Sequence, residues 1–511
     1  MQTPQTGSQV IAREIADLFC ARTPIVYLVT PDEERAIAVC KAAAGALKAQ
    51  TSTWSRNSGL LPASPDSRDP LSLLDSIHSG PSPSLSVLLD FPQSWNDPLV
   101  ARRLRDLLPA FTKEGRFLAV VASRLELPDN LANDTAVLRL PFPDRTELSA
   151  LLSTLSKAAF PASVQHRATT SASGLSYGQA RRAFIRALRK DAALGQEGLD
   201  LILSEKRRIL AQDLSLEYVD SDETMESVGG LESFKKWIDE RALAFLPEAR
   251  KYGLSEPRGV MLLGVQGCGK SLSAKSVARR FGVPLLRLDL ARVTGGHSAS
   301  SEEKLALALS AAESMAPAVL WVDEIEKAFA GTTGSDGRDS GAFRLLGSFS
   351  TWLQERQCPV FVVATANDVT KLPPELLRRG RFDELFFVDL PGSQARREIL
   401  AHHLRKRGRD PELFELDALA EQCTNYSGAE LEQIVVGGLH RSFAQKRELN
   451  AADLRRVARD IVPLSTTYEE QIKALREWAT GRTRNAGREA AVVDLFRRTS
   501  PLAKSSATGC N

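Results

Sequence analysis

The glycine-rich segment Gly264-Val265-Gln266-Gly267-Cys268-Gly269-Lys270-Ser271 constrains the fold of this chain more than any other feature. It follows the apolar run GVMLLG and precedes the helical pattern SLSAKSVARRF. A strand, a glycine loop and a helix in this order bind phosphate, because glycines let backbone N–H groups close around phosphate oxygens and the helix start adds its positive end. Lys270 is expected to neutralise the β- and γ-phosphates of a nucleotide. The predicted phosphate loop comprises Gly264, Gly267, Cys268, Gly269, Lys270, Ser271 and Leu272.

Short apolar runs alternate with amphipathic stretches between Gly259 and Asp389. The runs are GVMLLGV, PLLRLDLA, AVLWVDE, PVFVVATA and ELFFVDLP. This alternation is typical of a parallel sheet with crossover helices. After Pro391-Gly392 a helical periodicity takes over, which predicts a small helical lid.

Polar residues follow two of these apolar runs. AVLWV ends in Asp323-Glu324, and PVFVVATA ends at Asn367. Ligands of open α/β sheets bind at the carboxyl ends of the strands, so these side chains are expected beside the phosphate loop. Asp323 and the Ser271 hydroxyl are suited to hold Mg²⁺. Glu324 is suited to act as general base on the attacking water, and Asn367 to orient it. An acidic strand cap and an ordinary asparagine turn are the alternatives.

Together these motifs resemble the AAA branch of the AAA+ ATPases. The likeness rests on Val228-Gly229-Gly230, GVQGCGKS, LWVDEIEKAF, ATAND, LLRRGRFDELFFVDLP and the segment Tyr426 to Leu431. In the motif DEIEK, the N-terminal region and the tail, the chain is most similar to the ycf-type AAA proteins of some plastid genomes, cyanobacteria and other bacteria. The resemblance implies an α/β fold in which a P-loop AAA+ domain with a C-terminal helical lid binds ATP with Mg²⁺ and hydrolyses it.

The same resemblance implies further site residues. Arg378 and Arg381 would be arginine fingers that reach the ATP of a neighbouring subunit, so the active form would be a homo-oligomer, by implication a hexameric ring. Gly229 and Gly428-Ala429 would flank the adenine, since small residues permit close approach. His403 would contact the nucleotide from the lid. A solvated basic turn and an exposed helical histidine are the alternatives.

One departure from the family pattern concerns the client. AAA unfoldases carry an aromatic residue in the loop after the second strand, whereas this chain has His297 in the stretch Val293 to Ser300. A histidine weakens the case for threading a polypeptide, and it could instead stack on a base or meet a phosphate. The loop Gly331 to Gly341, with Arg338, could line the same pore. Two loops without a substrate role are the alternative.

The N-terminal region shows a fainter version of the same rhythm. PIVYLVT, LSVLLDF, RFLAVVAS and VLRLP follow in the order of the later strands, and Gly174-Leu175-Ser176 before a basic helix is similar to the lid. The first run leads into Thr30-Pro31-Asp32-Glu33-Glu34-Arg35, which has no glycine and would repel phosphate with its carboxylates. We predict a degenerate AAA-like α/β domain that does not hydrolyse ATP, with an unrelated α/β domain as the alternative.

Shifts in composition divide the chain into successive segments. The expected segments are an N-terminal α/β domain over 1–205, a linker over 206–227, the large ATPase subdomain over 228–391, the helical lid over 392–465, and a C-terminal helix with a flexible basic tail over 466–511.

Composition excludes several classes of protein. Of the 511 residues 43% are hydrophobic and 25% are charged, and no apolar run reaches the ~18 residues that a membrane-spanning helix needs. The net charge is +3, so no overall field favours nucleic acid or lipid. The N-terminus lacks a secretory signal pattern and the six cysteines are scattered. A reducing compartment follows: the cytoplasm, or the plastid stroma for a plastid-encoded chain.

Cys268 stands at a position where threonine is commoner in such loops. A thiol at a helix N-terminus can have a lowered pKa. Oxidation that blocks ATP binding is therefore a hypothesis, and a small side chain that points away from the nucleotide is the alternative.

Two functions stay open for such an ATPase. The first is a ring that remodels a macromolecular partner, either a protein or, given the basic tail, a nucleic acid. The second is an ATP-gated scaffold or switch whose nucleotide state controls assembly of a partner complex. An ATP-dependent metalloprotease is set aside, because no H-E-x-x-H helix occurs among the six histidines.

Overall fold

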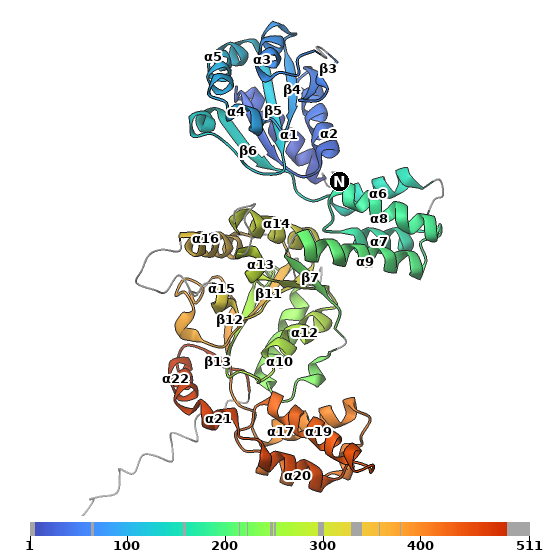
Figure 1. The fold of residues 1–511 in the computed structure, drawn as a ribbon, viewed down its shortest axis with the longest axis vertical. Coiled ribbons are helices and arrows are strands. Elements are labelled where there is room, and N and C mark those ends of the chain that lie inside the picture. Colours follow the sequence, from blue (N-terminus) through green and yellow to red (C-terminus); the bar gives the residue numbers. More distant parts are fainter. Residues whose placement is uncertain are drawn as a thin grey trace, which may run out of the picture. The chain divides into compact units, whose positions relative to one another are not determined.

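The structure of the protein is a computed structural model. It describes residues 6–62, 66–156, 160–213, 215–221, 223–245, 249, 252–294, 301–328, 340–356, 358–378 and 380–487. The chain divides into two compact units, one made mainly of residues up to 214 and the other mainly of residues from 215 on. Each unit is built around its own sheet (Figure 1).

The sheet of the first unit has the strand order β3-β2-β4-β5-β1-β6. Neighbouring strands are parallel except β2 and β3. The strands are β1 (Ile25–Val29), β2 (Gln50–Ser55), β3 (Gly59–Leu61), β4 (Ser84–Leu89), β5 (Arg116–Ala122) and β6 (Thr135–Arg139). One face is covered by α1 (Gly7–Cys20) and α2 (Glu33–Ala46), and the other by α3 (Pro70–Ser79), α4 (Pro92–Trp95) and α5 (Pro98–Glu114).

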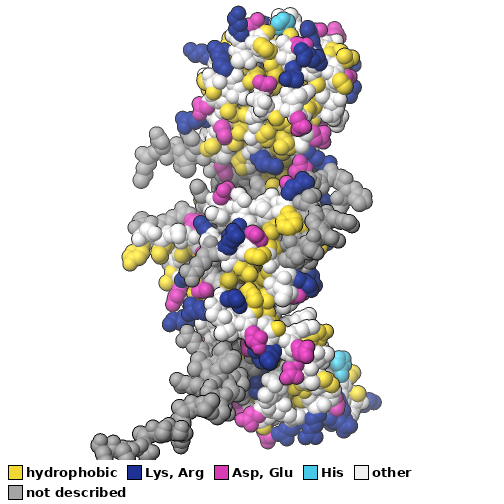
Figure 2. Space-filling model, turned by 90° about the vertical axis from the view of Figure 1, so that its left-hand side faces the viewer, with side chains coloured by type: hydrophobic (Ala, Val, Ile, Leu, Met, Phe, Trp, Pro, Cys, Tyr) yellow, Lys and Arg dark blue, Asp and Glu magenta, His cyan; other side chains and the backbone are white. Residues whose placement is uncertain are grey.

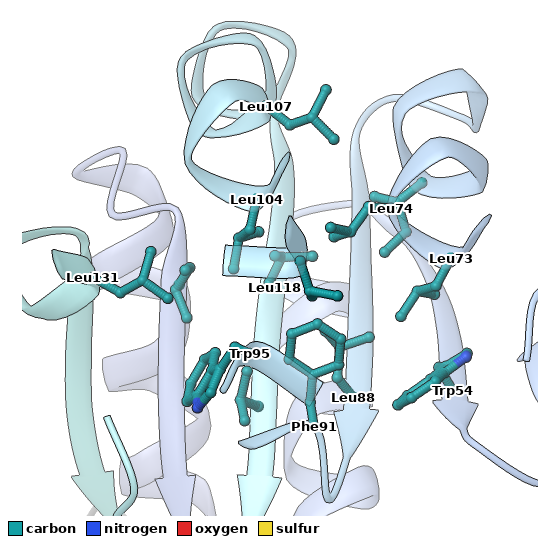
Figure 3. Packing of buried hydrophobic residues seen from close by; sticks show 14 of the residues in the cluster. Trp54, Leu73, Leu74, Leu88, Phe91, Trp95, Leu104, Leu107, Leu118 and Leu131 are labelled. Carbon is teal, nitrogen blue, oxygen red and sulfur yellow. The ribbon is translucent and has the colours of Figure 1, made fainter. Parts of the chain in front are cut away.

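Two separate cores lie on the two faces of this sheet. Along β1, Ile25, Tyr27 and Val29 pack toward α3, α4 and α5, whereas Val26 and Leu28 pack toward α1 and α2. The alternation follows the two-residue period of a strand. Large side chains fill the first of these cores, and Figure 3 labels Trp54, Leu73, Leu74, Leu88, Phe91, Trp95, Leu104, Leu107, Leu118 and Leu131.

The apolar runs predicted as strands in this unit correspond to β1, β4, β5 and β6. Strands β2 and β3 went unpredicted. The residues of β2, QTSTWS, are mostly polar and only partly covered, with Trp54 as the one fully buried side chain of that strand. An edge region of this kind leaves no apolar run in the sequence.

Helices α6 (Arg145–Leu155), α7 (Ala162–Ala172), α8 (Tyr177–Lys190) and α9 (Gln196–Asp213) complete the first unit. Asp32, in the loop after β1, connects α8 to the sheet through hydrogen bonds. Its buried carboxylate accepts the backbone N–H of Tyr177 at 2.7 Å and that of Gly178 at 3.2 Å. These residues begin α8, and a helix N-terminus favours an anion. The loop predicted to repel phosphate thus directs a carboxylate to a helix start of its own unit.

Asp32→Ala is expected to destabilise the first unit by about 1–3 kcal/mol, because two backbone N–H groups lose a charged acceptor. Hydrogen exchange of the full chain should show faster exchange at the start of α8. Glu33→Ala, which removes the exposed neighbouring carboxylate, is the matched control and should change stability by less than about 0.5 kcal/mol. Equal exchange in the two variants would contradict the role assigned to Asp32.

The sheet of the second unit has the strand order β13-β12-β8-β11-β10-β9-β7. Its strands are parallel except β7, which is antiparallel to β9. The strands are β7 (Leu216–Val219), β8 (Gly259–Gly264), β9 (Leu285–Leu288), β10 (Ala318–Val322), β11 (Val360–Ala366), β12 (Glu384–Val388) and β13 (Arg484–Asn485). Every residue of β8, β10 and β11 is buried, as expected for central parallel strands.

Helices connect these strands and form the lid. The connecting helices are α10 (Glu232–Ala242), α12 (Lys270–Phe281), α13 (Leu290–Thr294), α14 (Ser301–Ser314), α15 (Ile325–Ala328) and α16 (Ser340–Glu355). The lid consists of α17 (Ser393–Lys406), α18 (Leu416–Gln422), α19 (Gly428–Ala444) and α20 (Ala451–Asp460), and α21 (Leu464–Thr467) and α22 (Glu469–Ala479) follow it. Within the described ranges no helix is long and apolar enough to cross a membrane.

The two sheets share one strand order. When the parallel strands of each sheet are numbered along the chain, without β3, β7 and β13, both sheets read 5-1-4-3-2. Each sheet is also followed by helices, α6 to α9 in the first unit and α17 to α20 in the second. This common topology supports the predicted tandem repeat of an α/β domain.

The expected linker and tail both contain regular structure. Residues 206–227 were expected to link two domains, but they include the end of α9, with buried Ile209 and Leu210, and the strand β7. The segment from 466 contains the expected C-terminal helix, α22, and also the short strand β13, which pairs with β12. The strands β7 and β13 were not expected, because a strand of two to four residues leaves no periodic pattern.

Candidate nucleotide site

The phosphate loop connects β8 to α12, as predicted. Gly264 has φ of 148°, and a Cβ there would overlap the carbonyl oxygen of Val388 on β12. Gly269, immediately before α12, has φ of 88°, in the left-handed region that favours glycine. Glycine is therefore required at one of these positions by close packing and at the other by backbone conformation.

Lys270 is the first residue of α12, and its side chain is buried under the loop. Its Nζ donates hydrogen bonds to the carbonyl oxygens of Gly264 at 2.8 Å and Val265 at 2.7 Å. Burial lowers the pKa of Lys270 to about 8, although the neighbouring carboxylates of Asp323, Glu324 and Glu326 favour the charged form. The ammonium group is thus held at the loop and titrates near physiological pH.

ATP affinity is expected to fall about tenfold between pH 7 and pH 9, because a Lys270 with a pKa of about 8 loses its charge over this range. The sign follows from the ligand: phosphate binds the protonated amine, and the terminal phosphate of ATP is already ionised above pH ~7. Titration with a fluorescent ATP analogue at constant ionic strength measures the change. A dissociation constant that does not vary with pH would contradict it, and Lys270→Met provides the background without the amine.

Asp323 follows β10, and its carboxylate accepts hydrogen bonds from hydroxyl groups on two other elements. The Oγ of Ser271 on α12 lies 3.1 Å from Asp323 Oδ1, and the Oγ1 of Thr365 on β11 donates to the same oxygen at 2.6 Å. Arg287 on β9 lies 4.0 Å from the other carboxylate oxygen. The predicted pair Ser271 and Asp323 is therefore assembled at the carboxyl edge of the sheet.

The donor set at this edge suits a magnesium ion. Mg²⁺ prefers oxygen ligands and usually keeps several waters and phosphate oxygens, and Ser271 and Asp323 offer a hydroxyl and a carboxylate side by side. Among the described residues no group of three or more His, Cys, Asp or Glu side chains is placed to hold a metal ion. A magnesium ion held by Ser271 and Asp323 would take its other ligands from water and phosphate oxygens.

Glu324 lies next to Asp323 with a φ of 48°, an uncommon backbone conformation for a residue with a side chain. Its Oε1 accepts a hydrogen bond from Asn367 Nδ2 at 3.0 Å, and its Oε2 pairs with Lys327 Nζ at 2.5 Å. Its backbone N–H donates to Thr365 Oγ1 at 3.0 Å. The predicted residues Glu324 and Asn367 are thus in direct contact, and the carboxylate keeps partial exposure to solvent.

Thr365 and Glu326 belong to the same cluster but were not predicted. Thr365 bridges Asp323 and the backbone of Glu324. Glu326 is buried, its Oε1 accepts the backbone N–H of Asn367 at 3.0 Å, and burial raises its pKa. The sequence does contain both residues near the predicted site, Thr365 at the end of the β11 run and Glu326 as the second glutamate of DEIEK. Their contacts could not be predicted, because these depend on β10 and β11 being neighbours in the sheet.

The lid contacts the phosphate loop through the start of α19. The backbone N–H of Ala429 donates to the carbonyl oxygen of Gly267 at 2.9 Å. A Cβ on Gly428 would lie 3.2 Å from that same oxygen, and a Cβ on Gly267 would lie 3.1 Å from Ser427 Oγ. The predicted residues Gly428 and Ala429 therefore meet the loop backbone to backbone, where small side chains are needed.

Gly229 contacts the lid. A Cβ on Gly229 would lie 3.0 Å from the carbonyl oxygen of Ala395 in α17 and would crowd the side chain of Ile399. The adjacent Gly230 donates its N–H to Glu398 at 3.0 Å. Close packing against α17 thus accounts for the glycine independently of the predicted contact with adenine.

His403, expected to contact the nucleotide, lies on α17 with a side chain only 14% exposed. Its Nδ1 is 3.5 Å from Glu432 and 3.3 Å from Arg407. Burial lowers the pKa of His403 to about 4, although Glu432 favours the charged form. The imidazole is therefore neutral at physiological pH, and it would meet a nucleotide as a hydrogen-bonding or stacking group.

Two residues of the predicted phosphate loop pack against the core beneath it. Leu272 and Cys268 both border the hydrophobic cluster around β8 and α12. Burial raises the pKa of the Cys268 thiol to about 12, although Lys270 opposes the shift. This direction opposes the hypothesis of an acidic thiol, because desolvation outweighs the helix N-terminus. The side chain is only partly buried, so sensitivity to oxidation stays a prediction to be tested.

Peroxide is expected to inactivate the wild type and Cys268→Thr equally, since a thiol with a pKa of about 12 has almost no thiolate at pH 7 to 8. The measurement is ATP turnover after timed exposure to peroxide. Protection by the substitution would show that the thiol reacts despite its raised pKa.

Arg378 and Arg381 lie away from this cluster. Arg378 is exposed and lines a cavity together with Arg258, Asp383 and Glu384, which lie at the starts of β8 and β12. Arg381 is half-buried in the turn before β12. The structure thus places the two predicted arginine fingers at the amino edge of the sheet, opposite the phosphate loop.

Several predicted positions lie outside the described residues. These are His297, the loop 331–339 with Arg338, and the chain from 488 to 511. The pore-loop and tail hypotheses therefore stay predictions.

A parallel sheet of order 5-1-4-3-2, a phosphate loop and a helical lid define a nucleotide-binding α/β ATPase domain. Family models agree: residues 260–390 match the ATPase family associated with various cellular activities (AAA), residues 11–140 match the N-terminal domain of SpoVK-like AAA ATPases, and residues 145–213 match their second domain.

Similar proteins cover nearly the whole chain. The uncharacterized AAA domain-containing protein ycf46 of Pyropia yezoensis is 34% identical over 92% of this chain and 98% of its own length, and that of Guillardia theta is 36% identical over 91% and 94%. The ATP-dependent zinc metalloprotease FtsH of Acidothermus cellulolyticus is 34% identical over 48% of this chain and 38% of its own length. The chain belongs to the AAA ATPase family.

Proposed function

We propose that this chain is a Mg²⁺-dependent ATPase that works as a ring, by family resemblance a hexamer, and uses ATP to remodel a macromolecular partner. The proposal of a ring rests on one observation: the phosphate-binding residues and Arg378 lie far apart within one chain. The phosphate loop and the acidic cluster lie at one end of the strands, and Arg378 lies at the other.

The length of the strands supports a contribution from a second subunit. β8 has six residues, which at ~3.3 Å per residue span about 20 Å. An arginine side chain is much shorter than this distance, so Arg378 cannot reach a phosphate bound at the loop of its own chain. An arginine that stabilises the transition state must then come from a neighbour, as it does when a finger is supplied in trans.

The roles proposed for the acidic cluster follow from its contacts. Lys270 would bind the β- and γ-phosphates. Ser271 and Asp323 would hold Mg²⁺, which would supply positive charge to offset the charge of the phosphates. Glu324 would accept the proton of the attacking water. Asn367, which already donates to Glu324, would keep carboxylate and water in line.

The contact between the lid and the phosphate loop supports coupling between the bound nucleotide and the position of the lid. Ala429 bonds directly to Gly267 of the phosphate loop, so a change at the loop reaches the lid without an intermediate residue. Such coupling suits a remodeller, whose place of action would be the cytoplasm or the plastid stroma. An ATP-gated scaffold or switch would use the same contact, with hydrolysis as a timer.

ATP turnover measured against protein concentration tests the ring. Turnover per chain is expected to rise with concentration as oligomers form, and light scattering should show the change in mass. Constant turnover per chain in a monomer would refute the trans mechanism. Stimulation by unfolded protein, RNA or single-stranded DNA would support remodelling and identify the client, whereas slow unstimulated turnover with ATP-dependent partner binding would favour the scaffold.

A further inference from the structure

A cavity of about 900 Å³ opens at the amino edge of the second sheet, at the far end of the strands from the phosphate loop. Arginines from separate parts of the chain line it. Its charged lining residues are Arg258, Arg356, Arg378 and Arg482, with Glu256, Asp383 and Glu384.

Two of these arginines are already engaged. Arg258 donates to the carbonyl oxygen of Gly380, and Arg356 donates to that of Arg258. Asp383 is engaged as well, because its Oδ2 accepts the backbone N–H groups of Arg258 at 2.7 Å and Gly259 at 2.9 Å. These contacts form part of the wall of the cavity and hold Asp383 against the backbone.

Arg378 and Arg482 differ from Arg258 and Arg356 in their exposure: the first two are exposed and the other two are half-buried. Both line the same cavity, and no ion pair of either is found within the described parts of the chain. The cavity therefore presents two exposed guanidinium groups to the solvent. An anion from outside this chain would find both guanidinium groups available.

Arg482 is held in place by the segment that returns to the sheet after the lid. β13 pairs with β12, and the backbone N–H of Ala486 donates to Phe387 at 2.9 Å. One N–H of Arg482 donates to the carbonyl oxygen of Trp478 at 2.8 Å, and its guanidinium lies 5.8 Å from the indole ring of that residue. A guanidinium carries five N–H donors, so this single contact orients the group and leaves others for a ligand.

We infer that Arg482 acts with Arg378 as a second trans cation, which binds the phosphate groups of the nucleoside triphosphate held by the neighbouring subunit. The inference rests on the proposed ring, because the strand length that separates Arg378 from its own phosphate loop separates Arg482 from it too. Arg378 would meet the transferred phosphoryl group. Arg482 would hold the nucleotide phosphates in register and so positions the substrate.

Mixed oligomers test the inference. Arg482→Ala is expected to lower ATP turnover about 10- to 100-fold, as for loss of a hydrogen bond between charged groups, while ATP binding by the same subunit is unchanged. Lys270→Ala cannot bind ATP but still offers both arginines to a neighbour. Mixing these two inactive variants should restore turnover at interfaces where an intact phosphate loop faces an intact Arg482.

The matched control is Arg459→Ala. Arg459 is an exposed arginine of α20, and Figure 2 shows Lys and Arg side chains gathered along the lower edge of the lobe that contains this helix. Its loss removes the same charge outside the cavity and should leave turnover unchanged. Arg482→Gln keeps a donor for the Trp478 carbonyl group but no charge, and it replaces Arg482→Ala if the alanine variant does not assemble.

Arg378→Ala mixed with Lys270→Ala is the reference, because it tests the ring alone. Rescue of both arginine variants supports the inference. Rescue of Arg378→Ala without rescue of Arg482→Ala, or normal turnover by Arg482→Ala, overturns the role of Arg482 and leaves the ring intact. Rescue of neither variant overturns the trans mechanism and the inference together.

Discussion

Glu324→Gln is expected to lower ATP turnover by about 10²- to 10⁴-fold and to leave ATP binding intact, because a glutamine cannot accept a proton from the attacking water. The substitution keeps the shape of the side chain and an oxygen that can accept the hydrogen bond from Asn367 Nδ2. Phosphate release measures turnover, and a fluorescent ATP analogue measures binding. The variant should accumulate with ATP bound.

The same substitution also disturbs the pair with Lys327, so a control is needed. Lys327 is 70% exposed, and exposed ion pairs contribute little to stability. Lys327→Ala should therefore reduce turnover only slightly. If Lys327→Ala lost as much activity as Glu324→Gln, orientation of the carboxylate, not proton transfer, would explain the effect.

Arg378→Ala is expected to lower turnover by about 10³- to 10⁵-fold at concentrations where the wild type is assembled, because the transition state loses a finger supplied in trans. ATP affinity of isolated chains should not change, since Arg378 lies at the opposite edge of the sheet from the phosphate loop. Turnover at saturating ATP, with oligomeric mass followed in the same sample, measures the effect.

An exposed arginine can also matter for assembly alone. If Arg378→Ala lowered mass and turnover together, and high protein concentration restored both, the side chain would contribute to the interface and not to the transition state. Loss of turnover at unchanged mass is the result expected for a finger.

Those parts of the site could be predicted whose functional residues directly follow one another, or an apolar run, in the sequence. The phosphate loop, Asp323-Glu324 and Asn367 each follow an apolar run, and parallel strands bring the ends of such runs to one edge. Thr365 and Glu326 could not be identified in the same way, because their roles depend on which strands are neighbours.

The same distinction holds for the fold: elements with a local sequence pattern were predicted, and elements that depend on a distant partner were not. Long buried strands such as β8, β10 and β11 were visible as apolar runs. The edge strands β7 and β13 were not, since each has too few residues for a period and gains its structure from a distant partner. The place of Arg482 went unpredicted for this reason, although it lines the same cavity as Arg378.

The path of the chain through the lid restricts how the lid can move. The lid leaves the sheet directly after β12 and returns as α22 and β13 on the same edge, where Arg476 pairs with Asp389 at 2.8 Å. A body held by two neighbouring attachments rotates most easily about the line that joins them. Arg482 lies on the second attachment, close to that line, so a rotation of the lid would leave this arginine at the cavity, and the proposed trans cation would keep its place while the lid moves.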